Sequence, residues 1–294
     1  MTETSPAAAY RSVFRPGLFA GHLIWVTGGG SGIGRCVAHE LAALGAHVLI
    51  SGRKPDKLAA VQAEIRQDGG LCDWAAFDIR DDEAVRAQVA AVLAQHGRIH
   101  GLVNNAGGQF PAPLQMISKR GFEAVVANNL TGGFLMMREI FLQSMQPQGG
   151  GAIVNMTADF RNGMPGMAHS GAARAGMSNL TMSAGYEWAH AGVRVNAVAP
   201  GWVASSGMDS YGEEIREAIR GLKNHVPLRR LASEAEISAA IVFLLSPAAG
   251  FITGVTLQID GGASLGNPMF PSIDHAGTER YEGFHRAADP KVLG

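Results

Sequence analysis

The sequence predicts an α/β protein with a doubly wound sheet of seven parallel strands and helices on both faces. Short apolar, β-rich runs alternate along the chain with longer stretches of helical pattern. Strands that are joined by helical crossovers form a buried parallel sheet that is wrapped on both faces. With 294 residues, of which 47% are hydrophobic, the chain is long enough to bury this core as one domain.

The expected elements follow one another without interruption. Strands are expected at residues 23–27, 47–51, 72–77, 101–106, 151–156, 193–199 and 255–260. Helices are expected near residues 33–44, 56–67, 82–96, 119–146, 170–191 and 233–246. No linker or repeat appears before about residue 262, so we expect one domain over residues 1–264.

Two segments lie outside this alternation. Residues 201–227 follow a strand and are mostly helical or irregular, which suits a lid over a site at the carboxyl ends of the strands. Residues 265–294 are expected to form a polar tail outside the sheet, either packed on a neighbour or partly disordered.

Composition excludes several classes of partner. A net charge of −1 and a pI near 6.8 predict neither nucleic-acid binding nor a basic membrane patch. The chain shows no secretory signal pattern, and no window approaches 18 uncharged apolar residues. The two cysteines, Cys36 and Cys72, do not make a disulfide framework or a metal set. We therefore expect a cytoplasmic protein with reduced thiols and no bound metal.

A glycine loop predicts a dinucleotide site. The stretch "VTGGGSGIG" places Gly28, Gly32 and Gly34 between an expected strand and an expected helix. Glycines permit the turn and a close backbone approach, and the helix start offers free N–H groups to a pyrophosphate. With this loop at the front of an alternating chain, the predicted fold is Rossmann-like.

The end of the second strand favours NADP(H) over NAD(H). An acidic residue about 20 positions after the loop would hold a ribose 2′-hydroxyl, but this chain has Arg53 there, with Lys54 next and Ser51 before. Cations suit a 2′-phosphate, although they can also be solvated turn charges. Asp78 ends the third strand and can hold an adenine amine, cap the next helix, or do both.

Several motifs together resemble the short-chain dehydrogenase/reductases. They are "TGGGSGIG" at 27–34, "NNAG" at 104–107, Asn129 within "NNLTGGF", "IVNM" at 153–156 and "VNAVAPGWVASS" at 195–206. The resemblance covers about residues 18–264 and implies an NAD(P)(H)-dependent oxidoreductase that is usually a tetramer or dimer. It also implies that Asn129 helps to hold the active-site water and helix. The expected cofactor-binding residues are Gly28, Ser31, Gly32, Ile33, Gly34, Ser51, Arg53, Lys54, Asp78, Ile79, Asn105, Ala106, Gly107, Arg174, Pro200, Gly201, Val203 and Ser205.

The family's catalytic pattern is absent. The family carries a serine and, about 13 residues on, Tyr-x-x-x-Lys. Here the serine position falls on Ala158, the tyrosine position on Ser170 and the lysine position on Arg174. Ser170 and Arg174 are expected to share one helix face. We expect Arg174 to hold ribose hydroxyls, the alternative being a surface helix charge, and we expect His169 to be structural.

A narrower resemblance links the chain to reductases that act on a C=C bond. "NNAGGQF", "NLTGGF", "HSGAARAG" and "FLLSPAAGFITG" look like the peroxisomal-type trans-2-enoyl-CoA reductases, and the related 2,4-dienoyl-CoA reductases also lack the tyrosine. Bacterial chains of this appearance are also called citronellol/citronellal dehydrogenases. Serine is a far weaker acid than a phenol, and arginine does not donate a proton usefully.

The first hypothesis is therefore NADPH-dependent hydride transfer to the C=C of an enoyl- or dienoyl-CoA thioester. Charge collects on the thioester oxygen, where fixed hydrogen-bond donors can stabilise it. Asn129, Ser170 and Thr157 are candidate donors, and Asp159 is a candidate acid if burial raises its pKa, or else an exposed loop carboxylate. The alternatives are an NAD(P)-dependent alcohol/aldehyde dehydrogenase or ketone reductase with Asp159 or Tyr211 as base, and a non-catalytic dinucleotide-binding protein. The expected catalytic set is Asn129, Asp159, Ser170 and Arg174, and the expected substrate is an acyl-CoA or terpenoid-like small molecule.

Overall fold

A computed structural model describes residues 9–210, 212–266, 269 and 271–293. Seven parallel strands form one sheet, as predicted, and their order in it is β3-β2-β1-β4-β5-β6-β7. The strands are β1 (Leu23–Thr27), β2 (His47–Gly52), β3 (Leu71–Ala76), β4 (Gly101–Asn104), β5 (Gly151–Met156), β6 (Val193–Pro200) and β7 (Thr256–Ile259). Each predicted strand is therefore confirmed to within two residues at either end.

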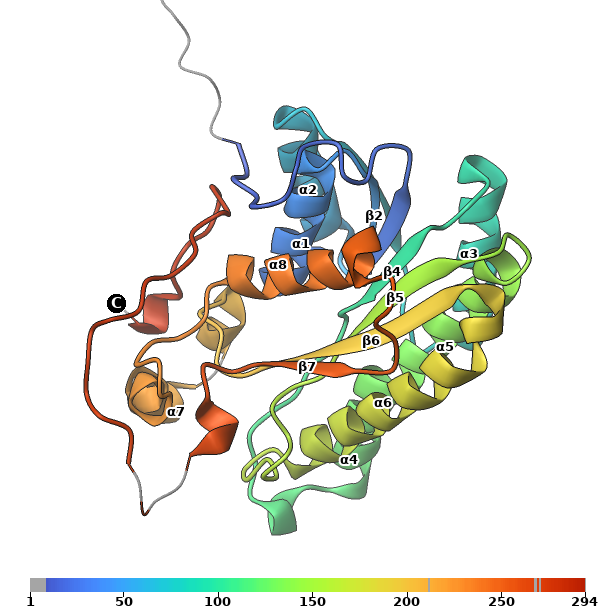
Figure 1. The fold of residues 1–294 in the computed structure, drawn as a ribbon. Helices are drawn as coiled ribbons and strands as arrows, with labels where there is room; N and C mark the ends of the chain where they lie inside the picture. The colour runs from blue at the N-terminus through green and yellow to red at the C-terminus, as the bar shows by residue number, and fades with distance from the viewer. Residues whose placement is uncertain (1–8, 211, 267–268, 270, 294) are drawn as a thin grey trace, which may run out of the picture.

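Helices cover both faces of the sheet (Figure 1). They are α1 (Gly32–Ala43), α2 (Pro55–Gln67), α3 (Asp82–His96), α4 (Lys119–Val126), α5 (Gly132–Ile140), α6 (Ala168–Glu187), α7 (Glu213–Gly221) and α8 (Glu234–Leu245). Among the described residues, no helix is long and apolar enough to span a membrane.

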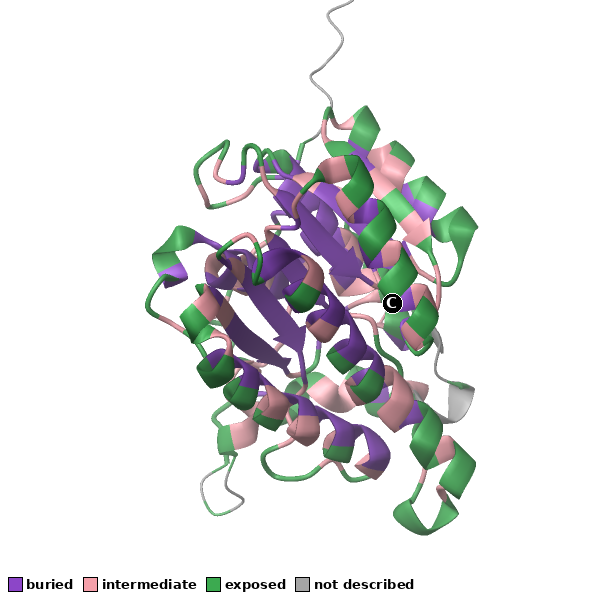
Figure 2. Cartoon of the chain, turned by 90° about the vertical axis from the view of Figure 1, so that its right-hand side faces the viewer, coloured by how far each residue is buried: buried purple, intermediate pink, exposed green. Residues whose placement is uncertain are grey.

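Two apolar cores lie on opposite faces of the sheet, because successive side chains of a strand point to opposite sides. On β1, Ile24 and Val26 pack with α1, α2 and α8 in one core, and Leu23 and Trp25 pack with α3, α5 and α6 in the other. Figure 2 shows buried strands in the middle of the sheet and helices exposed on their outer sides, while the edge strands β3 and β7 are partly exposed.

The expected helix over residues 119–146 is broken into pieces. Two π-helical turns, Ala127–Thr131 and Phe141–Met145, interrupt it around α5. The first turn contains Asn129, and π turns within helices are frequent at functional sites. Similarly, the helix expected at 170–191 begins at Ala168, and its last residues form a 3₁₀ turn at Ala189–Ala191.

The expected lid segment lies beyond the carboxyl ends of β5 and β6, where Figure 1 shows α7. It contains two 3₁₀ turns, Ser206–Ser210 and Leu222–His225, around α7. The tail packs on its own chain, since Val292 joins Met208 and Ile219 in a small apolar cluster. The tail therefore buttresses the lid segment.

Candidate active site

The direction of the crossovers reverses between β1 and β4. The glycine loop, which joins β1 to α1, lies at this point. In such sheets, ligands bind in the crevice outside the carboxyl ends of the strands where the order reverses. A cleft of about 230 Å³ lies here. Its lining residues are Gly28, Gly30, Ser31, Gly52, Arg53, Lys54, Lys57, Leu58, Phe77, Asp78, Ile79, Ala106, Gly107 and Asn128. The cleft therefore gathers many of the residues expected to bind the cofactor.

The glycine loop has no room for side chains. Gly28 and Gly32 have positive φ angles of +69° and +57°, a backbone region that L side chains rarely adopt. A Cβ on Gly34 would lie 2.4 Å from the carbonyl oxygen of Gly28 and 2.6 Å from the Asn105 amide nitrogen. The loop is thus held against the end of β4, and the N-terminus of α1 stays open, as a pyrophosphate requires.

Thr27 and Asn105 hold the ends of β1 and β4 together. The Thr27 hydroxyl accepts hydrogen bonds from the backbone N–H groups of Asn105 and Ala106, each at 2.9 Å. In return the Asn105 side chain donates to the Thr27 carbonyl at 2.9 Å. Asn105 therefore positions the loop with its side chain, and its neighbours Ala106 and Gly107 line the cleft.

The ribose end of the cleft is cationic. Arg53, Lys54 and Lys57 line it, and Asp78 is its one carboxylate among the described residues. Hydrogen bonds from Arg80 hold the pKa of Asp78 below its ordinary value, and the two side chains approach to 2.5 Å. Asp78 is thus neutralised locally and does not cap the next helix, since that position belongs to Asp81.

Ten of the eighteen expected cofactor ligands do not line this cleft, and three of these ten have contacts elsewhere. Ser51 is fully buried, and its hydroxyl accepts a hydrogen bond from the Trp25 indole N–H at 2.9 Å, so it supports β2 from the far side. Val203 is buried and pairs with Ala232 in an isolated bridge. Ser205 lies at the start of the lid segment, where its carbonyl accepts from Met208 N–H.

Arg174 is a buried cation and not a surface charge. Its guanidinium donates to the carbonyl of Met156 at 2.6 Å, and its Nε is buried without a partner. Burial lowers the pKa of Arg174 to about 10, so the side chain still carries a charge at neutral pH. No described carboxylate pairs with it, which leaves hydrogen-bond capacity for a ligand.

Asn129, Gly107 and Arg174 meet at one point. A Cβ on Gly107 would lie 2.6 Å from Arg174 Nη2 and 2.8 Å from Asn129 Oδ1. Asn129 accepts from the N–H of Gly108 at 2.8 Å and donates to its carbonyl at 3.0 Å. Asn129 therefore holds the loop that follows β4, and one of its two amide N–H groups is used in doing so.

These observations fit an NAD(P)(H) cofactor. The glycine cradle offers N–H groups and the cationic cleft offers countercharge. The Nε of Arg174, which has no partner, offers a donor for hydroxyl groups. Pro200 ends β6 and Gly201 follows it, and a Cβ on Gly201 would lie 2.9 Å from Asp260. Packing against Asp260 therefore requires a glycine at this position.

Ser170 keeps the expected place on the same helix as Arg174, but it has an unexpected partner. Its hydroxyl donates to Gln109 Oε1 at 2.6 Å. The sequence reasoning did not single out Gln109, although it stands in the "NNAGGQF" stretch. Thr157 is another candidate donor, and its hydroxyl donates a hydrogen bond to the Val198 carbonyl at 2.8 Å. Ser170 is thus bonded to a side chain, which can move, whereas Thr157 is bonded to the backbone of β6.

His169 packs at the start of α6, and its Nε2 is buried without a hydrogen-bond partner. It is fully buried, its Nδ1 accepts from the N–H of Ser170 at 2.9 Å, and its ring meets Phe110 edge to face at 4.4 Å. The ring thus anchors the start of α6 and leaves Ser170 and Arg174 on the active face.

Asp159 is a titratable group of this region, and it is not an ordinary exposed carboxylate. Its backbone N–H donates to the Pro200 carbonyl at 3.0 Å, and its Oδ1 is buried without a partner. Burial, and then the charge of Asp260, raise the pKa of Asp159 above its ordinary value. The side chain can therefore exchange a proton closer to neutral pH.

No described tyrosine reaches this site. Tyr186 is exposed on α6, while Tyr10 and Tyr281 pack with Cys36 and Phe284 beside α1. Tyr211, the lid residue considered as a base, lies outside the described residues. Among the described residues, Asp159 is thus the remaining candidate for proton transfer.

Fold and site together define a nucleotide-dependent oxidoreductase, and the chain belongs to the short-chain dehydrogenase/reductase family. The profile of the family described as enoyl-(acyl carrier protein) reductase matches residues 28–264. The chain is 35% identical to a probable 2,4-dienoyl-CoA reductase of Bacillus subtilis over 83% of its length and 96% of that protein.

Two solved structures are informative. The citronellol catabolism dehydrogenase AtuB of Pseudomonas aeruginosa is 60% identical, with a TM-score of 0.79, over 87% of this chain and 100% of that chain. A gluconate 5-dehydrogenase described as putative, from Beutenbergia cavernae with bound NADP, is 33% identical, with a TM-score of 0.79, over 86% of this chain and 100% of that one.

Proposed function

We propose that this protein is an NADP(H)-dependent dehydrogenase of an acyclic, terpenoid-like alcohol or aldehyde. The observation that carries this proposal is the 60% identity to the citronellol catabolism dehydrogenase over the whole of that chain. That level of identity is well above the 35% to the dienoyl-CoA reductase. This proposal reverses the order of our two sequence-based hypotheses, in which C=C reduction came first.

The choice of NADP(H) rests on charge. Arg53, Lys54 and Lys57 line the ribose end of the cleft, and Asp78 is neutralised there by Arg80. A 2′-phosphate gains charge-assisted hydrogen bonds from such cations, whereas a 2′-hydroxyl would leave them without countercharge.

The chain's own residues divide the work of the reaction. The bound nicotinamide supplies or accepts the hydride. Arg174 holds hydroxyl groups of the cofactor, while Asn129 fixes the end of β4 against it. Ser170 Oγ can turn from Gln109 and donate to the substrate oxygen, and Asp159 takes the hydroxyl proton in alcohol oxidation. The lid segment and the buried apolar residues beneath it exclude water.

One specific observation favours a second function: no described tyrosine reaches the site, so no phenol is available there to protonate an oxygen. Carbonyl reduction needs a proton on oxygen as hydride arrives, whereas reduction of a conjugated thioester needs hydrogen bonds to an enolate oxygen and a later proton on carbon. Ser170 and the amide of Gln109 can supply those hydrogen bonds, and Asp159 can supply the proton. C=C reduction of an enoyl- or dienoyl-CoA is therefore the alternative. Binding without catalysis is less favoured, because the site keeps a titratable group.

One assay series separates these functions. We expect NADP⁺ reduction with citronellol and NADPH oxidation with citronellal, and no turnover of crotonyl-CoA, longer 2-enoyl-CoAs or 2,4-hexadienoyl-CoA. The opposite pattern would establish the thioester function. NADPH binding without hydride transfer to any of these compounds would contradict both enzymatic proposals.

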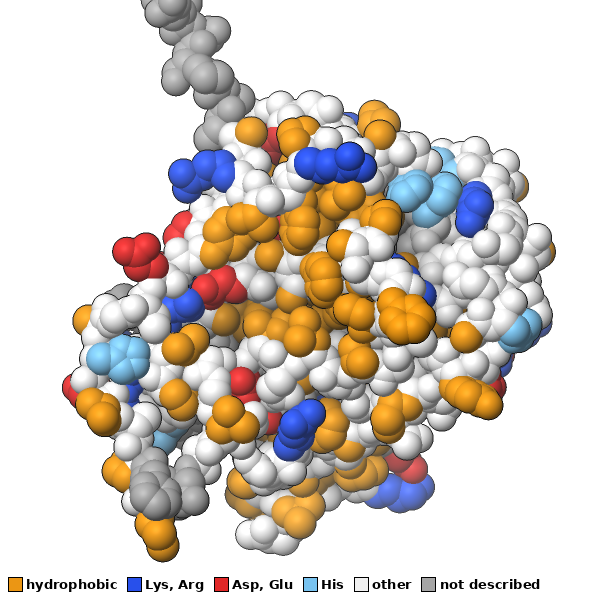
Figure 3. All heavy atoms as spheres, in the orientation of Figure 1, with side chains coloured by type: hydrophobic (Ala, Val, Ile, Leu, Met, Phe, Trp, Pro, Cys, Tyr) orange, Lys and Arg blue, Asp and Glu red, His pale blue; other side chains and the backbone are white. Residues whose placement is uncertain are grey.

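We also propose that the chain forms a homo-oligomer, a homotetramer or homodimer. Figure 3 shows apolar side chains gathered over α8 and β7. Phe251 is fully exposed there, and Val255 and Leu257 are 41% and 37% exposed. Patches of this kind mark interaction sites in soluble proteins. Light scattering on the purified protein tests this, and a monomeric mass would contradict it.

A further inference from the structure

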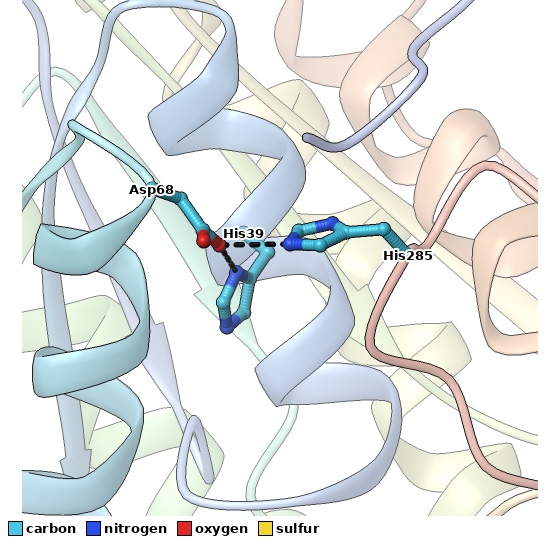
Figure 4. A group of neighbouring side chains, drawn as sticks. All are labelled: His39, Asp68 and His285. Atoms are coloured by element: carbon cyan, nitrogen blue, oxygen red, sulfur yellow. Dashed lines mark hydrogen bonds and ion pairs between the residues drawn. The ribbon is translucent and has the colours of Figure 1, made fainter. Parts of the chain in front are cut away.

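The C-terminal tail meets α1 and α2 through two imidazoles and a carboxylate (Figure 4). His39 comes from α1, Asp68 follows α2, and His285 comes from the tail. Asp68 Oδ2 lies 3.3 Å from His39 Nδ1 and 2.9 Å from His285 Nε2. The three side chains point toward one another from segments that are distant in the sequence.

His39 faces a carboxylate with each of its two ring nitrogens. Its Nε2 lies 3.1 Å from Glu64 Oε2, and its Nδ1 faces Asp68. The side chain is 2% exposed, so its two ring nitrogens face these carboxylates and not water. A neutral imidazole carries one proton, so a lone pair on one nitrogen then faces a carboxylate oxygen. A cation between them removes this repulsion.

The surroundings resemble the outer shell of a metal site. Glu64 accepts two hydrogen bonds from Arg35, at 2.7 and 2.9 Å, which fix its carboxylate. In this position Glu64 accepts a hydrogen bond from His39 Nε2. That arrangement leaves His39 Nδ1 as a ligand. A histidine that ligates a metal almost always donates its other N–H to a carboxylate or carbonyl in this manner.

We propose that His39 Nδ1, Asp68 Oδ2 and His285 Nε2 bind a divalent cation of the zinc class. Two nitrogens and a carboxylate are a common zinc donor set, with bonds of about 2.0–2.2 Å. Two atoms bound to one zinc ion therefore lie at most about 4.2 Å apart. The three ligating atoms lie within 4.8 Å of one another, so the site closes by about half an ångström, which the tail can supply.

Arg286 is the competitor for this position. Its Nε lies 3.0 Å from Asp68 Oδ2 and 3.2 Å from His285 Nε2, and its Nη2 lies 2.5 Å from Asp68 Oδ1. In the metal-bound protein, the Nε contact is given up while the contact to Oδ1 stays. The ion then joins the tail to α1, the helix that begins at Gly32 in the glycine loop.

The test is zinc binding by the full-length protein after treatment with a chelator. Calorimetric titration with ZnCl₂ is expected to give one ion per chain, and Co²⁺ is expected to give the intense absorption of a four-coordinate site. Zinc should also raise the thermal unfolding temperature of the wild type, because a ligand of the folded state stabilises it. His285→Ala should abolish all three effects.

A second variant and a matched control keep the test decisive. Glu64→Gln should weaken zinc binding about 10–100-fold, as the loss of outer-shell partners does. The described residues contain another group of this kind, His47, Asp73 and His96, which is less buried. His96→Ala should leave the titration unchanged. Absence of zinc binding, or its loss in His96→Ala but not in His285→Ala, would overturn the proposal.

Discussion

The two ends of the site are built in different ways. The cofactor end, around the glycine loop and the ends of β1 and β4, is shaped by backbone: a Cβ on Gly34 would lie 2.4 Å from a carbonyl oxygen. The reacting end is shaped by side chains that follow β5 and begin α6, among them Asp159 and Ser170. Backbone sterics tolerate few substitutions, whereas side chains can be exchanged without loss of the fold. The chain thus keeps the family's glycine loop, while a serine and an arginine follow β5 where the family pattern has tyrosine and lysine.

The largest effect is expected at the reacting end, from Asp159→Asn. If Asp159 is the base, alcohol oxidation should fall about 10²–10⁴-fold, since general base catalysis contributes that much. The affinity for NADP⁺ should stay unchanged, because Asp159 is not among the residues that line the cofactor cleft. Steady-state kinetics and a fluorescence titration with NADPH measure the two effects separately. An unchanged rate would remove Asp159 from the mechanism.

The pH profile sharpens the same prediction. Burial and the charge of Asp260 raise the pKa of Asp159, so oxidation should fall as the pH drops through that raised value, where the carboxylate becomes protonated. Asp260→Asn removes the neighbouring charge, so the acid limb of the profile should move to lower pH while the maximal rate is kept. A limb that does not move would mean that another group is titrated.

At the cofactor end, Gly34→Ala should weaken NADPH binding about 10–100-fold. Overpacking costs about 1–3 kcal/mol, and each 1.4 kcal/mol is a tenfold change in affinity. Gly277→Ala is the matched control, since a Cβ there meets nothing closer than 3.8 Å. Equal NADPH affinity in the Gly34 variant and the wild type would show that the loop is not the pyrophosphate site.

The same contrast explains what the sequence could and could not predict. The seven strands and the cleft around Gly28, Arg53 and Gly107 were predicted, because periodicity and glycine spacing report local backbone requirements. The burial of Arg174 and its position against Gly107 depend on packing between β4, α5 and α6. The bond of Ser170 to Gln109 joins residues 61 positions apart. Spacing does not reveal contacts of this kind.

Arg53→Ala tests how the cofactor end selects its ligand. Loss of one charged hydrogen bond, worth about 1.5–3 kcal/mol, should weaken NADPH binding about 10–100-fold and leave NADH binding nearly unchanged. Arg66→Ala is the control, because Arg66 pairs with Asp73 outside the cleft. Equal losses for NADPH and NADH would mean that Arg53 does not contact the 2′-phosphate.

The smallest effect is expected from two glutamates in the first turn of α8. Burial raises the pKa of Glu234 to about 7, against the opposing charge of Arg35. Between pH 4.5 and about 7 the folded state thus holds a proton that the unfolded state has lost, so the contribution of Glu234 to stability falls as the pH rises. Glu234→Gln should remove this loss and raise the unfolding temperature above pH 7 by a few degrees.

Glu236 is expected to behave in the opposite way. Burial alone would raise the pKa of Glu236, but hydrogen bonds from Arg230 and from the N–H of Ser233 outweigh it, and the pKa is lowered. The contribution of Glu236 to stability is present above its pKa in the unfolded state. It is lost as the pH falls through its pKa in the folded state. Glu236→Gln should therefore lower the unfolding temperature at pH 7, where Glu234→Gln raises it. Thermal unfolding followed across pH 4–9 compares the two variants, and shifts of the same sign would show that the hydrogen bonds to Glu236 do not distinguish these carboxylates.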